Sequence, residues 1–263
     1  HSDTAARVQP LPLYACSSAC QSAGRVYFKR NTMWRLCASL TVVLLYSSML
    51  GAAEAPLALP AAAQSHLPKG WKLLELVVAD LNSDGRDDLV IVREEADPKK
   101  ITKELPANDG VRNLNPRVLV VLLAEEGGYR KLAEFPKLIP PAFDPMYDMM
   151  DDRFNGISVK KGVLTVGFRY WASAGTWWMS MESYKFRLEA GRLRLIGSET
   201  DSFHRGSGEK DLVSTNHLTG KVKRTTGLNE FEEKEAVPKV EWETLPSRKS
   251  IYMEDLPCCA RKD

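Results

Sequence analysis

The sequence predicts an all-β protein of mostly antiparallel strands and hairpins, arranged as a sandwich or a partial propeller. Apolar residues occupy alternate positions in residues 164–170, and the pattern continues through residues 178–188, as in strands that bury one face. Glycine-containing turns of the hairpin type separate the apolar segments, at residues 126–129, 160–162, 189–192 and 218–221. These turns place consecutive strands side by side, which is the connectivity of an antiparallel sheet.

The N-terminal residues have the pattern of segments that precede a folded domain. Residues 1–32 come before the first methionine, Met33, and show no usable periodicity, so we expect a non-native or upstream segment. Residues 33–53 have the basic start, apolar run and small residues of a secretory signal peptide, with cleavage after Ala53 or Ala63. The apolar run is shorter than the roughly 20 residues that span a bilayer. We therefore expect a periplasmic or secreted protein without a membrane anchor in the mature chain.

The remaining chain predicts one domain of nearly balanced charge. We expect a short linker at residues 54–68, a single β-rich domain at residues 69–250 and a C-terminal tail at residues 251–263. Only five of the 36 basic residues and one of the 34 acidic residues precede Glu54. The domain therefore has no excess positive charge that would attract nucleic acid, and we expect no nucleic-acid partner.

The cysteines predict no disulfide framework. Three of the five lie before residue 54, and the other two, Cys258 and Cys259, are adjacent. Adjacent cysteines form a strained ring if they are joined, and no further cysteine remains to pair with them. The sequence leaves the role of this pair open, and stability must come from the core and from any bound ion.

Two apolar runs and two long connections complete the predicted fold. Residues 89–92 and 118–123 are apolar on both faces, which predicts central strands that are covered on each side. The connections at residues 94–115 and 134–156 are rich in Pro, Asn and Asp. Long connections of this kind in compact domains are either functional or mobile, and the sequence leaves both interpretations open.

A nine-residue segment between two apolar runs has the composition of a calcium loop. Residues 80–88 read Asp-Leu-Asn-Ser-Asp-Gly-Arg-Asp-Asp. Oxygen-bearing side chains at positions one, three, five and nine, a carbonyl at seven and a glycine at six can wrap one hard cation. The alternative is a metal-free turn rich in Asp and Asn. We expect Ca²⁺ to bind the carbonyl of Arg86 and the side chains of Asp80, Asn82, Asp84 and Asp88.

The flanking residues decide which kind of calcium loop this is. An EF-hand needs flanking helices and a carboxylate at position twelve, but Ile91 occupies that position within a strand-like run. The loop and its flanks, residues 78–91, resemble the FG-GAP (VCBS-type) repeat of integrin-α-like propellers, which reads Asp-x-Asn-x-Asp-Gly-x-x-Asp before an apolar strand. The resemblance implies a mainly structural ion that braces a hairpin, in a small exported bacterial protein with one such motif.

These observations favour an exported calcium-binding domain that acts as a binding or interaction module for a protein or glycan ligand. The rigid loop would hold neighbouring loops in place for the partner. The alternative is an extracytoplasmic hydrolase that uses the acidic loop at residues 144–152 with His204 or His217. The sequence identifies no catalytic residue and leaves the oligomeric state open.

The segment at residues 170–178 gathers aromatic residues around a small turn. Aromatic side chains are most often part of a core, so we expect these rings to be buried. The alternative is a set of exposed rings that stack on a sugar or a peptide. The rings concerned are Tyr170, Trp171, Trp177 and Trp178.

Overall fold

The strands of this protein pair antiparallel throughout the computed structural model, which describes residues 57–102, 112–145, 150–232, 237–247 and 249–256. The all-β prediction is therefore confirmed. The predicted upstream segment and signal peptide, residues 1–53, lie outside the described residues, as do Cys258 and Cys259.

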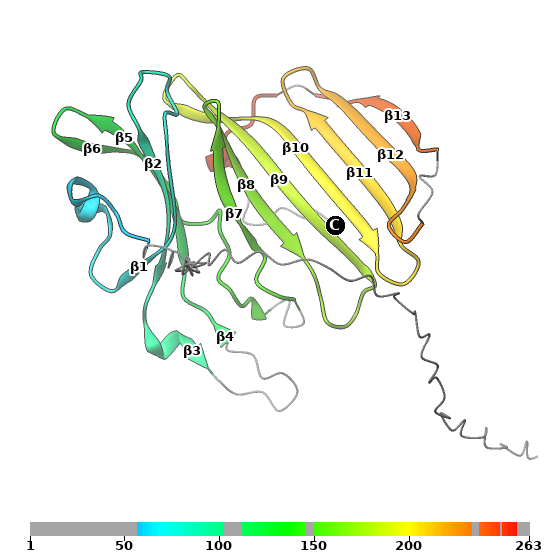
Figure 1. Ribbon diagram of the computed structural model, residues 1–263, viewed down its shortest axis with the longest axis horizontal. Coiled ribbons are helices and arrows are strands. Elements are labelled where there is room, and N and C mark those ends of the chain that lie inside the picture. The colour runs from blue at the N-terminus through cyan, green and yellow to red at the C-terminus, as the bar shows by residue number, and fades with distance from the viewer. Residues whose placement is uncertain (1–56, 103–111, 146–149, 233–236, 248, 257–263) are drawn as a thin grey trace, which may run out of the picture. The chain divides into compact units, whose positions relative to one another are not determined.

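Two sheets make up most of the described chain (Figure 1). The four-stranded sheet has the order β1 (Trp71–Ala79), β2 (Asp88–Glu95), β5 (Arg117–Glu125) and β6 (Gly128–Phe135). The seven-stranded sheet is a meander of β7 (Phe154–Lys160), β8 (Val163–Tyr170), β9 (Trp178–Glu189), β10 (Arg192–His204), β11 (Glu209–Asn216), β12 (Lys221–Asn229) and β13 (Lys239–Thr244). A small pair of strands is formed by β3 (Ile101–Thr102) and β4 (Arg112–Asn113).

The helical segments of the described chain are short 3₁₀ turns. They include η1 (Ala61–His66), η2 (Pro98–Lys100) and η4 (Met253–Asp255). Within the described residues, none of the helices has the length and apolar character needed to cross a membrane. The buried hydrophobic side chains of the described residues come mainly from the strands.

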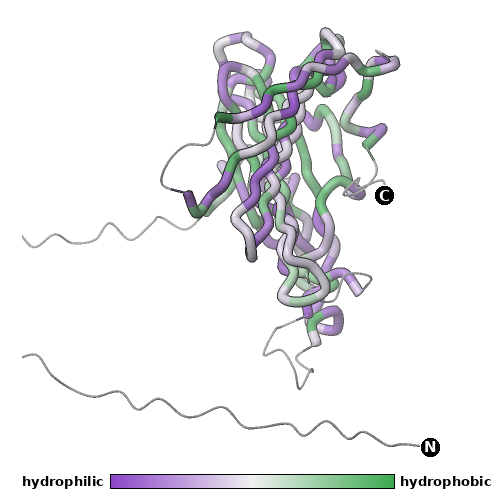
Figure 2. The backbone as a smooth tube through the Cα atoms, turned by 90° about the vertical axis from the view of Figure 1, so that its right-hand side faces the viewer, coloured by the Kyte–Doolittle hydropathy of each residue, from purple (hydrophilic) through white to green (hydrophobic). Residues whose placement is uncertain are grey.

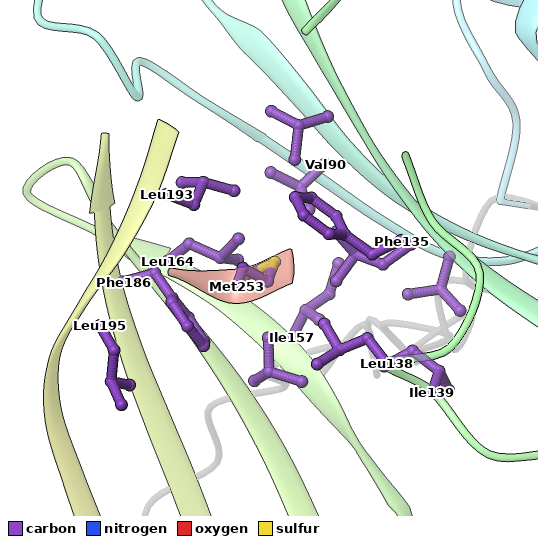
Figure 3. Close-up of a cluster of buried hydrophobic side chains, with 14 of the residues drawn as sticks. Val90, Phe135, Leu138, Ile139, Ile157, Leu164, Phe186, Leu193, Leu195 and Met253 are labelled. Carbon is purple, nitrogen blue, oxygen red and sulfur yellow. The ribbon is translucent and has the colours of Figure 1, made fainter. Parts of the chain in front are cut away.

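The main core lies between the two sheets, as in a β-sandwich. Side chains of β2 and β5 face those of β8, β9 and β10, and Figure 3 shows Val90 and Phe135 on one side of this core with Leu164, Phe186 and Leu193 on the other. Hydrophilic and hydrophobic residues alternate along many of the strands (Figure 2), as expected where a strand buries only one face. The beginning of the predicted C-terminal tail also contributes to this core, because Met253 is buried in it.

The four-stranded sheet is covered on its other face too. Leu89, Ile91 and Val120 point away from the main core and pack on Leu59 and Ala63. The prediction of central strands covered on both sides is confirmed, since β2 and β5 are buried along almost their whole length. The segment predicted as a linker thus covers this face of the sheet. Signal-peptide cleavage after Ala63 would remove Leu59 and Ala63, whereas cleavage after Ala53 would keep both.

The predicted hairpin turns are present, and two of them have both central residues at positive φ. Lys161 and Gly162 have φ of 53° and 71° between β7 and β8, and Ala190 and Gly191 have φ of 48° and 77° between β9 and β10. Two consecutive positive φ angles are the signature of a type I′ turn, whose twist matches that of the strands. The turn sequences therefore fix the register of the meander locally.

A buried ion network joins the four-stranded sheet to the beginning of the seven-stranded sheet. Glu94 on β2 is 1% exposed and accepts hydrogen bonds from Lys72 Nζ at 2.7 Å and Asn113 Nδ2 at 2.9 Å. Arg117 on β5 donates from Nε to Glu94 at 2.7 Å and from both terminal nitrogens to Asp152 at 2.7 Å each. Asp152 lies just before β7, so Arg117 connects the two sheets.

The network keeps Glu94 ionised despite its burial. Burial by itself raises the pKa of Glu94, but the hydrogen bonds from Lys72, Arg117 and Asn113 outweigh it, and the pKa lies below its ordinary value. Burial likewise disfavours the charge of Arg117, while hydrogen bonds to Asp152 and Glu94 raise its pKa overall. Glu94 and Arg117 are therefore both charged at neutral pH.

We expect Arg117→Ala to lower the free energy of unfolding by about 3–5 kcal/mol, because it removes the buried cationic partner of the Glu94 carboxylate and releases Asp152. Urea unfolding of the purified protein measures this change.

Arg130→Ala is the matched control for this substitution. Arg130 pairs with Glu125 on the surface, and both side chains are about half exposed, so the expected change is within about 0.5 kcal/mol. Equal losses in the two variants would contradict the structural role of the buried network.

Candidate functional site

The β1–β2 loop carries the predicted calcium ligands, and its base is fixed to the core through Asp88. Asp88 is fully buried; its Oδ2 accepts the Leu81 N–H at 2.9 Å and its Oδ1 accepts the Ala124 N–H at 2.8 Å. Leu81 itself belongs to the main core. Asp88 thus ties the loop to the end of β5, and this role does not depend on an ion.

The tip of the loop curls around the side chain of Asp80. Its Oδ1 accepts the N–H groups of Ser83 at 2.7 Å and Asp84 at 3.2 Å, and its Oδ2 accepts the Gly85 N–H at 2.9 Å. Asn82 Oδ1 accepts the Asp84 N–H at 2.9 Å. Ser83 and Gly85 have φ of 64° and 81°, and these left-handed residues give the sharp turn that the spacing predicts. The acidic and amide oxygens therefore face the inside of the loop.

The guanidinium of Arg86 lies on Asp84. Its Nη2 and Nε donate to Asp84 Oδ2 at 2.7 and 3.2 Å, and Asn82 Nδ2 donates to the same oxygen at 3.0 Å. These hydrogen bonds, led by the Arg86 side chain, lower the pKa of Asp84 to about 2. Asp84 is therefore fully ionised at any physiological pH and presents a carboxylate to a cation.

The chemistry of this donor set fits a hard divalent cation. The side-chain oxygens belong to carboxylate and amide groups, and each carboxylate oxygen bonded to a single N–H retains a further lone pair. Among the residues that the structure describes, no three His, Cys, Asp or Glu side chains gather closely enough to hold a metal ion. A cation bound to Asp84 would take the place that the Arg86 guanidinium occupies, and Arg86 is about half exposed and free to turn into solvent.

A second feature is a groove of about 680 Å³ on the face of the seven-stranded sheet that points away from the core. The register places residues of five neighbouring strands directly opposite one another across it. Three of the five residues in this row have small side chains or none, and Trp242 on β13 continues the row beyond Lys223. In order from β8 to β12, the row contains Gly167, Ser183, Glu199, Ser214 and Lys223.

Two of the acidic residues that line the groove, Glu199 and Asp201, are paired with lysines of neighbouring strands. Lys185 Nζ lies 2.8 Å from Glu199, and Lys210 Nζ lies 3.3 Å from Asp201. Together with Lys223, these two lysines offset three of the four acidic residues that line the groove, so its surface is polar and nearly neutral in charge. Such a surface suits a ligand that forms many hydrogen bonds and carries little net charge.

Glu75 closes one end of the groove at the junction of β1 and β7. Its Oε2 accepts the Ile157 N–H at 3.1 Å, and its Oε1 lies 3.1 Å from the position a Cβ would take at Gly156. Gly156 has φ of 94°, so both its conformation and its close approach to Glu75 favour glycine. Burial raises the pKa of Glu75, and the Ile157 hydrogen bond offsets this in part.

The acidic loop of the predicted hydrolase uses its carboxylates to bind arginines. Asp144 pairs with Arg153 at 2.6 Å, and Asp151 pairs with Arg169 at 3.4 Å. Asp152 is held by Arg117, as described above, and Asp148 lies outside the described residues. The three described aspartates are thus each bound to a different arginine.

The two candidate histidines lie near opposite ends of β10. His217 follows β11, where its N–H donates to the carbonyl of Ile196 and its Nε2 lies 3.0 Å from Ser198 Oγ. Burial lowers the pKa of His217. His204 ends β10, and its Nδ1 lies 2.9 Å from Ser207 Oγ. The structure therefore does not bring the two imidazoles together.

The aromatic segment is only partly buried. Tyr170 belongs to the core as predicted, but the expectation of burial is wrong for Trp177 and Trp178, which are 64% and 39% exposed. The indole of Trp178 meets the ring of His204 edge-on, with 5.3 Å between the centroids. Trp177 lies in the connection between β8 and β9, Trp178 is the first residue of β9, and neither belongs to the two buried hydrophobic clusters of the described chain.

Sequence reasoning found the loop but missed the groove. The loop ligands lie within nine consecutive residues, so their spacing can be recognised from the sequence alone. The groove residues come from separate strands and meet only through the register, although the alternation at Thr165, Gly167 and Ser183 signals a face of small side chains. In the comparisons with known proteins, no family model, curated protein or solved structure matches this chain.

We expect Glu75→Gln to stabilise the protein at neutral pH and to have little effect below the pKa of free glutamate. The raised pKa means that the folded state binds the proton more tightly than the unfolded state, so this stability is present at low pH and is lost as pH rises through the folded pKa. Glutamine keeps an acceptor for Ile157 without the charge.

Thermal unfolding of both proteins between pH 4 and pH 8 measures this difference. A gap between the two midpoints that is the same at every pH would contradict the assignment of the effect to the Glu75 carboxyl.

Proposed function

We propose that this protein is an exported, calcium-stabilised β-sandwich that acts as a binding module. The single observation that carries the proposal is the β1–β2 loop, in which oxygen side chains at alternate positions turn inward between two antiparallel strands. This hairpin setting is the one that the resemblance to the FG-GAP repeat implies. The ligands we propose are the Arg86 carbonyl and the side chains of Asp80, Asn82, Asp84 and Asp88.

The ion would have a mainly structural role in this proposal. Calcium supplies positive charge that offsets the mutual repulsion of the loop carboxylates. Asp80 and Asp84 hold the tip of the loop in its curled form, and Asp88 fixes the base to β5. The hairpin is thereby a rigid support for what packs beside it.

The loop is connected to the groove through the β7–β8 turn. A Cβ at Gly162 would lie 3.6 Å from the Leu81 carbonyl oxygen and 3.9 Å from Ser83 Oγ, so this turn touches the loop. Strands β7 and β8 lead from the turn to the groove, where Ser158 and Thr165 line the wall. A rigid loop therefore holds one side of the groove in place, which reduces the entropy lost on binding.

The groove is the surface that we propose for the partner. Its volume lies within the range of about 300–1,000 Å³ that is usual for ligand sites. Its paired charges and hydroxyl groups suit a polar, nearly neutral partner, such as a glycan or an extended protein segment. The balanced charge of the domain argues against nucleic acid as the partner.

We expect calcium to raise the thermal unfolding midpoint. At about 100 times its dissociation constant, a ligand that binds only the folded state adds about 2.7 kcal/mol, which corresponds to a shift of roughly 5–10 °C for a domain of this size. Asp84→Asn should abolish most of the shift, because it removes a proposed ligand charge. Calorimetric titration with calcium gives the stoichiometry, which should be one.

Asp87→Asn is the matched control, since it removes the same charge from an exposed position of the same loop. It should keep most of the calcium-dependent shift. An unchanged midpoint in the wild-type protein, together with no heat of calcium binding, would refute the metal proposal.

We expect Ser183→Trp to block the groove without unfolding the domain. Ser183 lies in the middle of the row, and a tryptophan there fills the space above Gly167 and Glu199. Binding to glycan arrays and to extracytoplasmic protein extracts should fall at least about tenfold relative to wild type. Lys131→Trp on β6 adds the same side chain to the other sheet and should leave binding unchanged. Equal binding by all three proteins would show that the groove is not the binding surface.

A further inference from the structure

A separate cavity of about 350 Å³ lies on the core-side face of the seven-stranded sheet, at the end away from the β1–β2 loop. The core-side residues of β8 are Leu164, Val166, Phe168 and Tyr170, and the cavity begins at Tyr170, where this face leaves the main core. The β7–β8 turn, at the other end of β8, contacts the calcium loop. The cavity and the loop are therefore separated by the length of β8.

The register gathers polar side chains of four strands in one row of this cavity. Tyr170 on β8 lies opposite Ser180 on β9, Ser180 lies opposite Ser202 on β10, and Ser202 lies opposite Asp211 on β11. Side chains that are opposite one another across neighbouring strands lie about 4.5–5.5 Å apart at Cβ. The row thus presents three hydroxyl-bearing side chains followed by a carboxylate.

An indole forms the wall beside this row. Trp178 precedes Ser180 by two residues on β9, so both side chains lie on the same face of the sheet. Trp178 lines the cavity and keeps 39% of its surface exposed, which leaves its ring accessible to a ligand. Tyr170 is almost fully buried and closes the opposite side.

The neighbouring contacts hold the indole in position. Thr176 Oγ1 accepts the backbone N–H of Trp178 at 3.1 Å, which fixes the chain at this residue, and His204 packs edge-on against the indole ring. Arg205 donates from Nη2 to the carbonyls of Ala172 at 2.9 Å and Thr176 at 2.7 Å, which fixes the turn that leads into β9. The wall is therefore preorganised, and a ligand need not order it on binding.

The chemistry of this cavity selects a neutral ligand with many hydroxyl groups. Serine and tyrosine hydroxyls both donate and accept hydrogen bonds, while the carboxylate of Asp211 only accepts them. An anionic ligand would be repelled by Asp211, and the residues that line the cavity include no lysine or arginine. An apolar ligand would bury the hydroxyl of Ser180 and the carboxylate of Asp211 and offer them no hydrogen bond, which is unfavourable. A sugar ring offers hydroxyls to the row and C–H groups to the negative face of the indole.

We propose that this cavity binds a single pyranose ring, stacked on Trp178 and hydrogen-bonded by Ser180, Ser202 and Asp211. The volume suits a small ligand or the end of a longer glycan. The site lies on the opposite face of the sheet from the groove, so it is a binding site beyond the proposed function and does not depend on calcium.

A panel of methyl glycosides tests the proposal on the full chain, with binding followed by tryptophan fluorescence and by calorimetry. The panel contains the α and β methyl glycosides of glucose, galactose, mannose and N-acetylglucosamine. At least one should bind the wild-type protein, with the same affinity in calcium and in chelator. Trp178→Ala should weaken binding about tenfold or more, and Trp178→Phe should restore part of it because a ring is kept.

Trp242→Ala is the matched control, because Trp242 is 65% exposed on β13 and lies outside the cavity. The Trp242→Ala protein should bind the glycoside with the same affinity as wild type, and thermal unfolding should confirm that each variant is folded. The proposal is overturned if no glycoside in the panel binds, if Trp178→Ala binds as tightly as wild type, or if Trp242→Ala loses binding as well. Loss of binding in chelator would also overturn it, since the site would then depend on the loop.

Discussion

The burial of β2 and β5 on both faces is the constraint on which the rest of this structure depends. Two adjacent strands with apolar side chains on each face cannot be stable in a sheet that is open to water on one side. The seven-stranded sheet covers one face, and the segment around Leu59 and Ala63 covers the other. The ion network of Glu94, Arg117 and Asp152 then fixes how the two sheets meet, because it is formed only where the two strands approach the beginning of β7.

The candidate calcium loop is a direct extension of this buried layer. Asp88 is both the first residue of β2 and the last proposed ligand, and its two oxygens accept N–H groups from the loop and from β5. A buried carboxylate needs such partners, so the base of the loop is fixed by the same burial that stabilises the sheet. The tip has no such support beyond its own hydrogen bonds and the pairing of Asp84 with Arg86, and it is the tip that an ion would make rigid.

The sequence predicts those features that depend on neighbouring residues. Short-range patterns encode the all-β fold class, the hairpin turns and the burial of β2 and β5 on both faces. The structure confirms these three predictions. The groove and the cavity beside Trp178 depend instead on the register of five and four strands, which no local pattern specifies. The exposure of Trp177 and Trp178 is likewise not encoded locally, since it depends on which distant side chains the fold packs against them.

Amide hydrogen exchange at the β1–β2 loop, with calcium and with chelator, tests this account most directly. The Leu81 and Ala124 amides should be protected in both conditions, because Asp88 accepts their hydrogen bonds without an ion. The Ser83 and Gly85 amides should exchange more slowly with calcium than with chelator, because the ion would hold the tip closed around Asp80. Equal exchange of the tip amides in both conditions would contradict the account.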